Sequence, residues 1–340
     1  MSARHPNAYK LLVDPDHPQC RARLSNAHQD TTLMHALSQV FSLMRRGHND
    51  PPSHDKAQLI GIALLCGAVL FFTLMDATAK YLTQSYSVTQ VVWARFFGNA
   101  LIVTLIFRQR VPALMRSRQP ALQFWRAMAQ LGSVGLFFTS LQFIGLAEAT
   151  AIMDSNPVLI TLGAALFLKE KIGIRRMLGI AAALVGALIV IRPGTGVFQP
   201  AALLPVLGAF TYAGGALLTR LVRSDSTATS ILWSAYAGLI VTTFFVPFSW
   251  QSIALQDLPY FLALAVLGTI SQILLIKAFS MGEAGSLAPF GYTALIWAGF
   301  WGWLFFDQLP DRWTILGGTI IVGAGLYVWS REAQASRKQE

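Results

Sequence analysis

Apolar stretches of about 20 residues follow one another from Ala57 to Ser330. A bilayer core is ~30 Å thick, so a helix that rises 1.5 Å per residue needs about 20 residues to cross it. The stretches are continuously apolar and do not alternate with a period of two, which predicts helices and excludes a β-barrel. Ten spans are predicted, over residues 57–80, 88–107, 121–141, 147–168, 174–191, 200–220, 228–248, 257–277, 284–306 and 313–330.

Residues 1–56 differ from the rest because they contain all six histidines and no long apolar run. They predict a disordered cytoplasmic tail and not a signal peptide, which would need an early apolar core and a cleavage site. Met34 and Met44 are alternative starts. Residues 331–340 predict a second cytoplasmic tail. The alternative for the first tail is a metal site formed by His5, His17, Cys20 and His28.

Basic residues are distributed unevenly between the two sides of the predicted membrane. From Arg45 onwards, the loops and tails on the side of the termini hold 17 of the 26 Lys and Arg residues, whereas the other side holds Lys80, Arg192 and Arg312. The positive-inside rule therefore places both termini in the cytoplasm, which an even number of spans satisfies. The net charge of +10 thus reflects membrane topology, and no nucleic acid partner is expected.

Composition narrows the class of protein further. The chain is 54% hydrophobic and only 12% charged, about half the charge of a soluble domain, which excludes soluble enzymes. Its two cysteines cannot form a disulfide framework. Paired-His metal motifs, Gly-rich phosphate loops and Gly-x-Ser-x-Gly elbows are missing from the sequence. We therefore expect no enzyme activity, no catalytic residue, no metal and no cofactor.

The two halves of the chain resemble each other. Trp93 and Gly98 recur 140 residues later as Trp233 and Gly238, and further ordered matches recur at offsets of 135 to 137. Each half contains five predicted spans, an odd number, so the second half enters the membrane inverted, as in secondary carriers. The predicted fold is an all-α polytopic membrane protein with ten transmembrane helices in two inverted five-helix repeats, 57–192 and 200–330.

Several motifs carry a resemblance to a known family. In the first half they are Leu146-Ala147-Glu148-Ala149-Thr150-Ala151-Ile152, Pro157, Leu168-Lys169-Glu170, Arg175-Arg176 and Arg192-Pro193-Gly194, and in the second half Ala288-Pro289-Phe290, Tyr292-Thr293 and Gly325-Leu326-Tyr327. They resemble the EamA-type repeat of the drug/metabolite transporter superfamily, in the branch of riboflavin and S-adenosylmethionine uptake carriers. The resemblance implies transport through a central cavity lined by helices 1, 3, 4, 6, 8 and 9. It leaves the substrate open.

Asp154 is the strongest functional candidate, because ionisable side chains within spans are costly. It lies about seven residues into the fourth predicted span, roughly 10 Å from the outer surface. Thr150, Asp154 and Pro157 share one helical face, and Pro157 removes a backbone amide beside the carboxylate. We expect solute binding or proton coupling there, with a structural hydrogen bond as the alternative. The resembling family commonly has an uncharged residue here, so its mechanism does not transfer.

Other polar residues lie on faces that we expect to avoid lipid. Arg126 and Gln130 share a face of the third span, where Arg126 attracts an anionic group or snorkels to lipid phosphate. Asp76 and Lys80 are spaced for a helical ion pair. The predicted substrate-binding or coupling residues are Asp154, Thr150, Arg126, Gln130, Asp76, Tyr212, Gln272 and Tyr292, with helix kinks at Pro157 and Pro289.

These observations predict a secondary active transporter of a small polar organic metabolite in the bacterial inner membrane. It would work by alternating access, with proton coupling through Asp154 as an additional hypothesis. The alternatives are a passive facilitator or channel, and a metabolite or drug exporter of the same fold. The expected partners are a small-molecule solute and the lipid bilayer, and a homodimer is an open alternative.

Overall fold

A computed structural model of the chain describes residues 54–168, 174–192, 200–222, 225–281 and 284–337. The chain divides into Met1–Asp55 and Lys56–Glu340, and every contact described below lies in the second unit. Helices and short 3-10 turns make up these described ranges, which contain no β-strand, so the all-α prediction is confirmed. Residues 1–53, with their candidate metal ligands, and parts of the family motifs lie outside the described residues.

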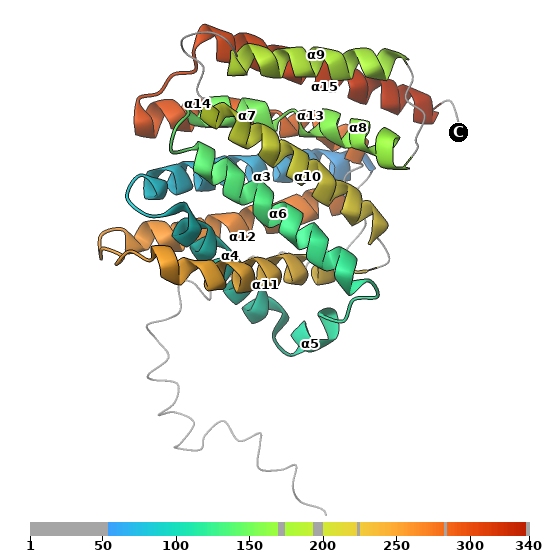
Figure 1. Cartoon of the computed structure of the whole chain (residues 1–340). Helices are drawn as coiled ribbons and strands as arrows, with labels where there is room; N and C mark the ends of the chain where they lie inside the picture. The colour runs from blue at the N-terminus through green and yellow to red at the C-terminus, as the bar shows by residue number, and fades with distance from the viewer. Residues whose placement is uncertain (1–53, 169–173, 193–199, 223–224, 282–283, 338–340) are drawn as a thin grey trace, which may run out of the picture. The chain divides into compact units, whose positions relative to one another are not determined.

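Helices occupy all ten predicted spans (Figure 1). The fourth and ninth spans are each divided into two helices, and the last helix continues through most of the predicted tail 331–340. The helices are α3 (His54–Thr83), α4 (Val88–Phe107), α5 (Val111–Leu114), α6 (Pro120–Ser140), α7 (Leu146–Met153), α8 (Asn156–Leu168), α9 (Ile174–Ile191), α10 (Leu203–Leu221), α11 (Thr227–Phe245), α12 (Leu258–Met281), α13 (Ala284–Gly291), α14 (Thr293–Phe306) and α15 (Arg312–Arg337).

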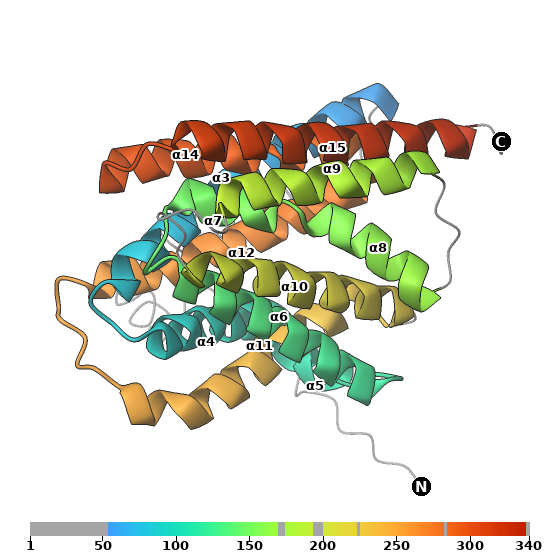
Figure 2. The same ribbon diagram turned by 45° about the horizontal axis from the view of Figure 1, so that its top comes forward.

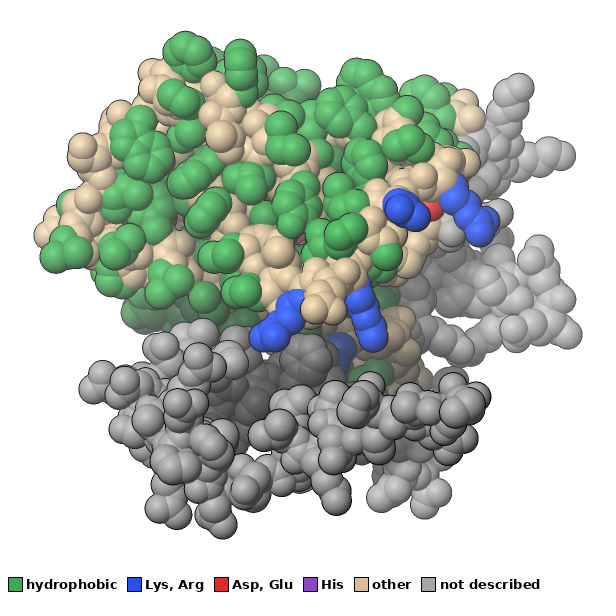
Figure 3. Space-filling model, turned by 90° about the horizontal axis from the view of Figure 1, so that it is seen from below, with side chains coloured by type: hydrophobic (Ala, Val, Ile, Leu, Met, Phe, Trp, Pro, Cys, Tyr) green, Lys and Arg blue, Asp and Glu red, His purple; other side chains and the backbone are tan. Residues whose placement is uncertain are grey.

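Several helices have the length and composition of membrane spans. The segments that qualify are Ala57–Thr83, Val88–Leu114, Pro200–Leu221, Thr227–Ser249 and Leu258–Met281, and Met177–Ile191 and Arg312–Val328 are shorter apolar helices. Figure 3 shows a face on which the described side chains are mostly hydrophobic and Lys and Arg lie near the border. The chain is therefore a multi-pass membrane protein. The number of spans and their inverted arrangement stay predictions.

Equivalent helices of the two predicted repeats begin in the same way. Ser87 precedes α4 and accepts a hydrogen bond from the Gln90 amide at 3.2 Å. Ser226 precedes α11 and accepts one from the Thr229 amide at 3.0 Å. A serine at this position satisfies an amide that has no partner within the helix. The second helix of each half is thus started by the same device.

Four helix pairs organise the bundle. Helix α9 lies along α15 at one edge in both ribbon views, and α6 packs along α10 (Figures 1 and 2). Helix α4 packs against both α11 and α12. A shared apolar core, which includes Met75, Phe96, Phe138, Leu146 and Leu264, joins α3, α4, α6, α7 and α12. Polar residues that interrupt these helices therefore face either this interior or the lipid.

Gly98 lets α4 approach α12 closely. A Cβ atom built at Gly98 would collide with the Ala265 side chain and lie 3.0 Å from the Ala265 Cα atom. The obstacle is partly backbone, so a side-chain rotation cannot relieve it. At Gly214 of α10, by contrast, nothing lies within 4 Å of such an atom.

We predict that Gly98→Ala lowers the free energy of unfolding by about 1–3 kcal/mol, because it overpacks the α4–α12 contact. Gly214→Ala is the control, since it adds the same methyl group where space is open. The midpoint of thermal unfolding of the purified protein in detergent measures both. Equal midpoints for the two variants would contradict the close approach of α4 and α12.

Candidate functional site

The fourth and ninth predicted spans break at corresponding positions. Helix α7 has eight residues and Asp154 directly follows it, and helix α13 also has eight residues and Tyr292 directly follows it. A second helix starts just beyond each break, α8 at Asn156 and α14 at Thr293. Asp154 and Tyr292 are thus equivalent residues of the two halves.

The sequence around each break explains it locally. Pro157 lies in the first turn of α8, where its missing amide is tolerated but cannot continue α7. Pro289 lies within α13, three residues before the second break. At the breaks, the Ser155 hydroxyl donates to the Ile152 carbonyl, and the Thr293 hydroxyl donates to the Phe290 carbonyl, both at 2.7 Å. The same hydroxyl device satisfies one backbone carbonyl in each half.

Unpaired polar atoms gather at the first break. Four buried side-chain oxygens in the described part of the chain have no hydrogen-bond partner, and three of them belong to Thr150, Asp154 and Asn156. Thr150 is only 7% exposed. The Asp154 carboxylate at the first break interacts electrostatically with the hydroxyl of Tyr292 at the second break. A buried polar atom without a partner costs about 1–3 kcal/mol, so these atoms are expected to meet water, a proton or a ligand.

Tyr212 is accessible although it points away from the outward apolar face of α10. That face carries the exposed Leu203, Phe210 and Leu221, whereas Tyr212 lies about 180° around the helix from Leu203. Tyr212 nevertheless has 47% of its surface exposed. The accessible surface of Tyr212 therefore belongs to the inner side of α10.

Three further predicted binding residues have no side-chain hydrogen bond to a described residue, namely Gln130, Gln272 and Tyr292. Each is partly exposed. Gln130 lies midway along α6, ten residues from either end. Polar groups at such depth do not face lipid without cost. The structure thus leaves the side chains of Gln130 and Gln272 without hydrogen-bond partners among the described residues, whereas the Tyr292 hydroxyl packs against Gly325 of α15.

The predicted ion pair between Asp76 and Lys80 is wrong. The Lys80 ammonium donates to the carbonyls of Leu141 at 3.0 Å and Ile144 at 2.6 Å, just beyond the last turn of α6. Carbonyls at a helix end lack intrahelical partners and attract a cation. Asp76 instead interacts electrostatically with Arg95 of α4.

Arg126 joins α6 to α11. Its guanidinium donates to the Gln123 side chain at 2.9 Å, to the Ser234 hydroxyl at 2.8 Å and to the Ser230 carbonyl. It is 8% exposed, so the structure supports neither the predicted snorkelling nor a free cation for solute. Arg126 therefore ties the first half of the chain to the second at the end predicted to be cytoplasmic.

An acidic loop residue that the sequence pattern did not single out also joins the two halves of the chain by hydrogen bonds. Asp225, between α10 and α11, accepts hydrogen bonds from the Ser117 hydroxyl, the Arg118 amide at 3.1 Å and Gln123 at 3.0 Å. These hydrogen bonds, that from Ser117 foremost, hold the pKa of Asp225 below its ordinary value. No motif marked it, because its partners lie more than 100 residues away.

A second tie between the halves lies at the opposite end of the helices. Arg192, after α9, forms an ion pair of 2.6 Å with Asp311, before α15. Glu148, in the first turn of α7, lies within electrostatic range of both, and of Lys80. Charged contacts therefore join the halves at both ends, on either side of the helix breaks.

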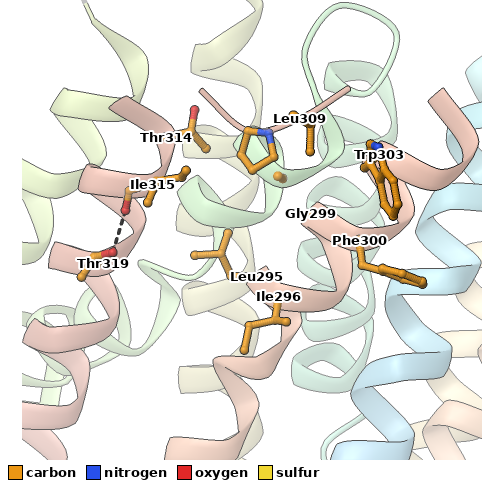
Figure 4. Close-up of a pocket in the computed structure, with 11 residues that line it drawn as sticks. Leu295, Ile296, Gly299, Phe300, Trp303, Leu309, Thr314, Ile315 and Thr319 are labelled. Atoms are coloured by element: carbon orange, nitrogen blue, oxygen red, sulfur yellow. Dashed lines mark hydrogen bonds between the residues drawn. The ribbon is translucent and has the colours of Figure 1, made fainter. Parts of the chain in front are cut away.

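Two hollows on the described part of the surface have mostly apolar linings. One of about 380 Å³ lies between α7, α14 and α15 and is lined by residues such as Leu295, Ile296 and Phe300 (Figure 4). Another of about 530 Å³ lies between α6 and α10. Neither contains a predicted binding residue, and their apolar linings suit lipid chains.

Comparison with known proteins identifies similar chains. Residues 59–192 and 199–330 each match the EamA-like transporter family. The chain is 28% identical over 269 residues to the pseudopaline exporter of Pseudomonas aeruginosa, which covers 78% of this chain and 94% of that one. It is 28% identical to the riboflavin transporter of Rhizobium johnstonii (82% and 94% covered). It is 25% identical to the S-adenosylmethionine uptake transporter of Rickettsia bellii (84% and 98% covered).

The fold also has a solved counterpart. A crystal structure that is 17% identical superposes with a TM-score of 0.58 and covers 84% of this chain and 99% of its own. The family match spans most of the chain and confirms the resemblance noted in the sequence. The similar proteins are named as transporters, in agreement with a transport function and not an enzyme.

We predict that the hydrogen bonds to Asp225 stabilise the protein at pH values above 3.8, the ordinary pKa of its carboxyl group. This stabilisation is lost as the pH falls through the lower pKa that the carboxyl group has in the folded state. Asp225→Asn should therefore lower stability at pH 7 by about 1 kcal/mol or less, since the site is partly exposed. The difference from wild type should shrink towards pH 3. Thermal midpoints across this range measure it, with the exposed Asp307→Asn as control. A difference that is independent of pH would refute the contribution of the carboxylate.

Proposed function

We propose, from the premise that this chain belongs to the EamA-like transporter family, that it is a secondary transporter of a small polar organic metabolite in the bacterial inner membrane. The observation that carries the proposal is the pair of helix breaks with Asp154 and Tyr292 at equivalent positions. Transporters commonly bind solutes where discontinuous helices of two repeats meet near the membrane midplane.

The proposed architecture has ten spans in two inverted repeats, with both termini in the cytoplasm. Support comes from the family match in each half, from the equivalent serine caps and from the equivalent helix breaks. The excess of basic residues on one side supports the orientation.

We assign the solute path to the polar residues that lack partners. Asp154 and Thr150 offer oxygens from the first break, and Tyr292 offers a hydroxyl from the second. Tyr212 and Gln130 come from the neighbouring helices α10 and α6. Gln272 of α12 and Asp76 of α3 complete the proposed path, whereas Arg126 has a structural role.

The proposed alternating access rests on the position of the polar contacts that join the two halves of the chain. Arg126 joins the halves at one end and the Arg192–Asp311 ion pair joins them at the other, with the breaks between. A solute reaches the breaks from one face only when the tie at that face opens. Opening one tie while the other holds keeps the membrane sealed.

Proton coupling through Asp154 fits its surroundings. Its buried Oδ2 atom has no hydrogen-bond donor, and no cation forms an ion pair with it in the described residues. A carboxylate in such a place takes up a proton or a positively charged group. The names of similar proteins include both uptake and export, so they favour neither direction of transport for this chain.

We predict that Asp154→Asn abolishes accumulation driven by a pH gradient and retains solute exchange. A difference of about one pH unit drives a carrier that couples one proton to one solute to about tenfold accumulation. Proteoliposomes with riboflavin and S-adenosylmethionine as first solutes measure both activities, with Asp307→Asn as control. If neither solute moves, ligand-induced thermal stabilisation across a metabolite library selects others.

Three outcomes separate the alternatives. Full accumulation by Asp154→Asn would refute proton coupling through this residue. Flux without exchange between labelled and unlabelled solute would favour a passive facilitator. Loss of exchange as well as accumulation, in a variant that still unfolds at the wild-type temperature, would make Asp154 a binding residue only.

A further inference from the structure

The connection between α4 and α6 carries arginines on both sides of a short apolar helix. Helix α5 has the sequence Val-Pro-Ala-Leu, and Met115 follows it. Two arginines precede this apolar stretch and two follow it, namely Arg108, Arg110, Arg116 and Arg118. All four side chains are exposed. A strongly basic surface therefore begins where the apolar helix α4 ends.

Little negative charge balances these arginines. None of the four guanidinium groups forms an ion pair with a carboxylate of the described residues. Asp225 interacts electrostatically with Arg118, but its oxygens already accept hydrogen bonds from the Ser117 hydroxyl and the Arg118 backbone amide. Arg108 donates from its Nε atom to the Leu105 carbonyl at 3.3 Å, and a carbonyl does not neutralise its charge. The connection thus presents an excess of positive charge.

Hydrogen bonds to the second half of the chain hold the backbone of this connection in place. Trp233 of α11 donates from its indole nitrogen to the Met115 carbonyl at 3.1 Å. Asp225 holds the Ser117 hydroxyl, and the Arg118 amide at 3.1 Å. Helix α5 lies at the edge of the bundle in both ribbon views, where it contacts α11 (Figures 1 and 2). The arginines are therefore carried by a fixed part of the bundle edge.

The equivalent connection of the second half is built without this charge. It joins α11 to α12, and Val246-Pro247 begin its short 3-10 helix as Val111-Pro112 begin α5, at an offset of 135 residues. Residues 246–257 contain no Lys or Arg. A short helix thus forms at this place without arginines, so the four in the first half are not needed to build the connection.

Phospholipid headgroups match these arginines in charge and geometry. A guanidinium group presents a planar fork of donors that pairs with phosphate oxygens. Clusters of four or more basic residues directly beside a membrane-spanning helix, on its cytoplasmic side, attract anionic lipids. The excess of basic residues predicts that this end of α4 is cytoplasmic. The apolar stretch between the two arginine pairs suits the boundary between headgroups and acyl chains.

We propose that the α4–α6 connection, residues 108–118, is a binding surface for anionic phospholipids of the cytoplasmic leaflet. The four arginines bind lipid phosphates, and α5 lies at the level of the headgroups with its apolar side chains towards the acyl chains. The bound lipids hold the cytoplasmic end of α4 in the membrane. The competing explanation is that the arginines only direct membrane insertion, which requires no lipid to stay bound afterwards.

Lipid binding to the full-length purified protein tests the proposal. The probes are phosphatidylglycerol, which is anionic, and phosphatidylcholine, which has the same phosphate but no net charge. Native mass spectrometry measures the bound lipid across a titration of each. We expect wild type to bind phosphatidylglycerol about tenfold more tightly or better. Arg108→Gln and Arg116→Gln should each weaken that binding about fivefold, and the double variant should weaken it more than tenfold.

Controls separate lipid binding from insertion and from general charge effects. Arg312→Gln makes the same change at an exposed arginine of the end predicted to be outer, and it should leave phosphatidylglycerol binding unchanged. Arg108→Lys and Arg116→Lys keep the positive charge that directs insertion and should retain part of the affinity even where the glutamine variants misfold. Inorganic phosphate is added as a competitor and should not displace the lipid, because it has no acyl chain.

Three results would overturn the lipid surface. One is equal binding of phosphatidylglycerol and phosphatidylcholine by wild type. Another is phosphatidylglycerol binding by the double Arg108→Gln and Arg116→Gln variant within about twofold of wild type. The third is displacement of the lipid by inorganic phosphate, which would assign the arginines to a soluble anion. None of the three bears on the proposed transport function, which rests on the helix breaks.

Discussion

The hydrocarbon core of a membrane contains no water, so every polar group within it must find a partner in the protein. Two of the predicted spans break after a first helix of eight residues, which frees backbone groups at that depth. The protein satisfies one carbonyl at each break with the hydroxyl of Ser155 or Thr293. It leaves the side-chain oxygens of Asp154 and Thr150 without partners. The same constraint that makes the helices regular elsewhere thus supports the proposal of a solute site at the breaks.

Hydrophobic pattern alone predicted the helices well, because the bilayer thickness sets one length for all of them. All ten predicted ranges are helical. The breaks were predicted only as kinks at Pro157 and Pro289. The run from Leu146 to Leu168 is apolar on both sides of Asp154, so hydropathy does not show where hydrogen bonding changes. Asp154 and Thr150 were singled out because polar residues within spans need a reason, and Tyr292 because it is an aromatic residue of the ninth predicted span. Their part in solute binding stays a prediction.

Partners distant in the sequence could not be predicted. Local spacing gave Lys80 an ion pair with Asp76, but Lys80 binds carbonyls more than 60 residues away. Arg126 was expected near solute or lipid, and its partners distant in the sequence lie on α11. The roles of Asp225 and Asp311 depend on loops that meet only in the folded bundle. Helix periodicity describes one element at a time, whereas these contacts depend on how the two halves pack.

Accessibility of Tyr292 tests the central claim, that the helix breaks form a solute site open alternately to the two faces. Cys20 and Cys66 are replaced by serine, Tyr292→Cys is introduced, and a membrane-impermeant thiol reagent is applied to inside-out and right-side-out vesicles. Ile296→Cys, one turn further on the exposed apolar side of α14, is the control. The account predicts that the thiol at position 292 reacts from both faces and is protected by a transported solute, while that at 296 reacts from neither. Reaction from neither face at position 292, or no protection by solute, would contradict it.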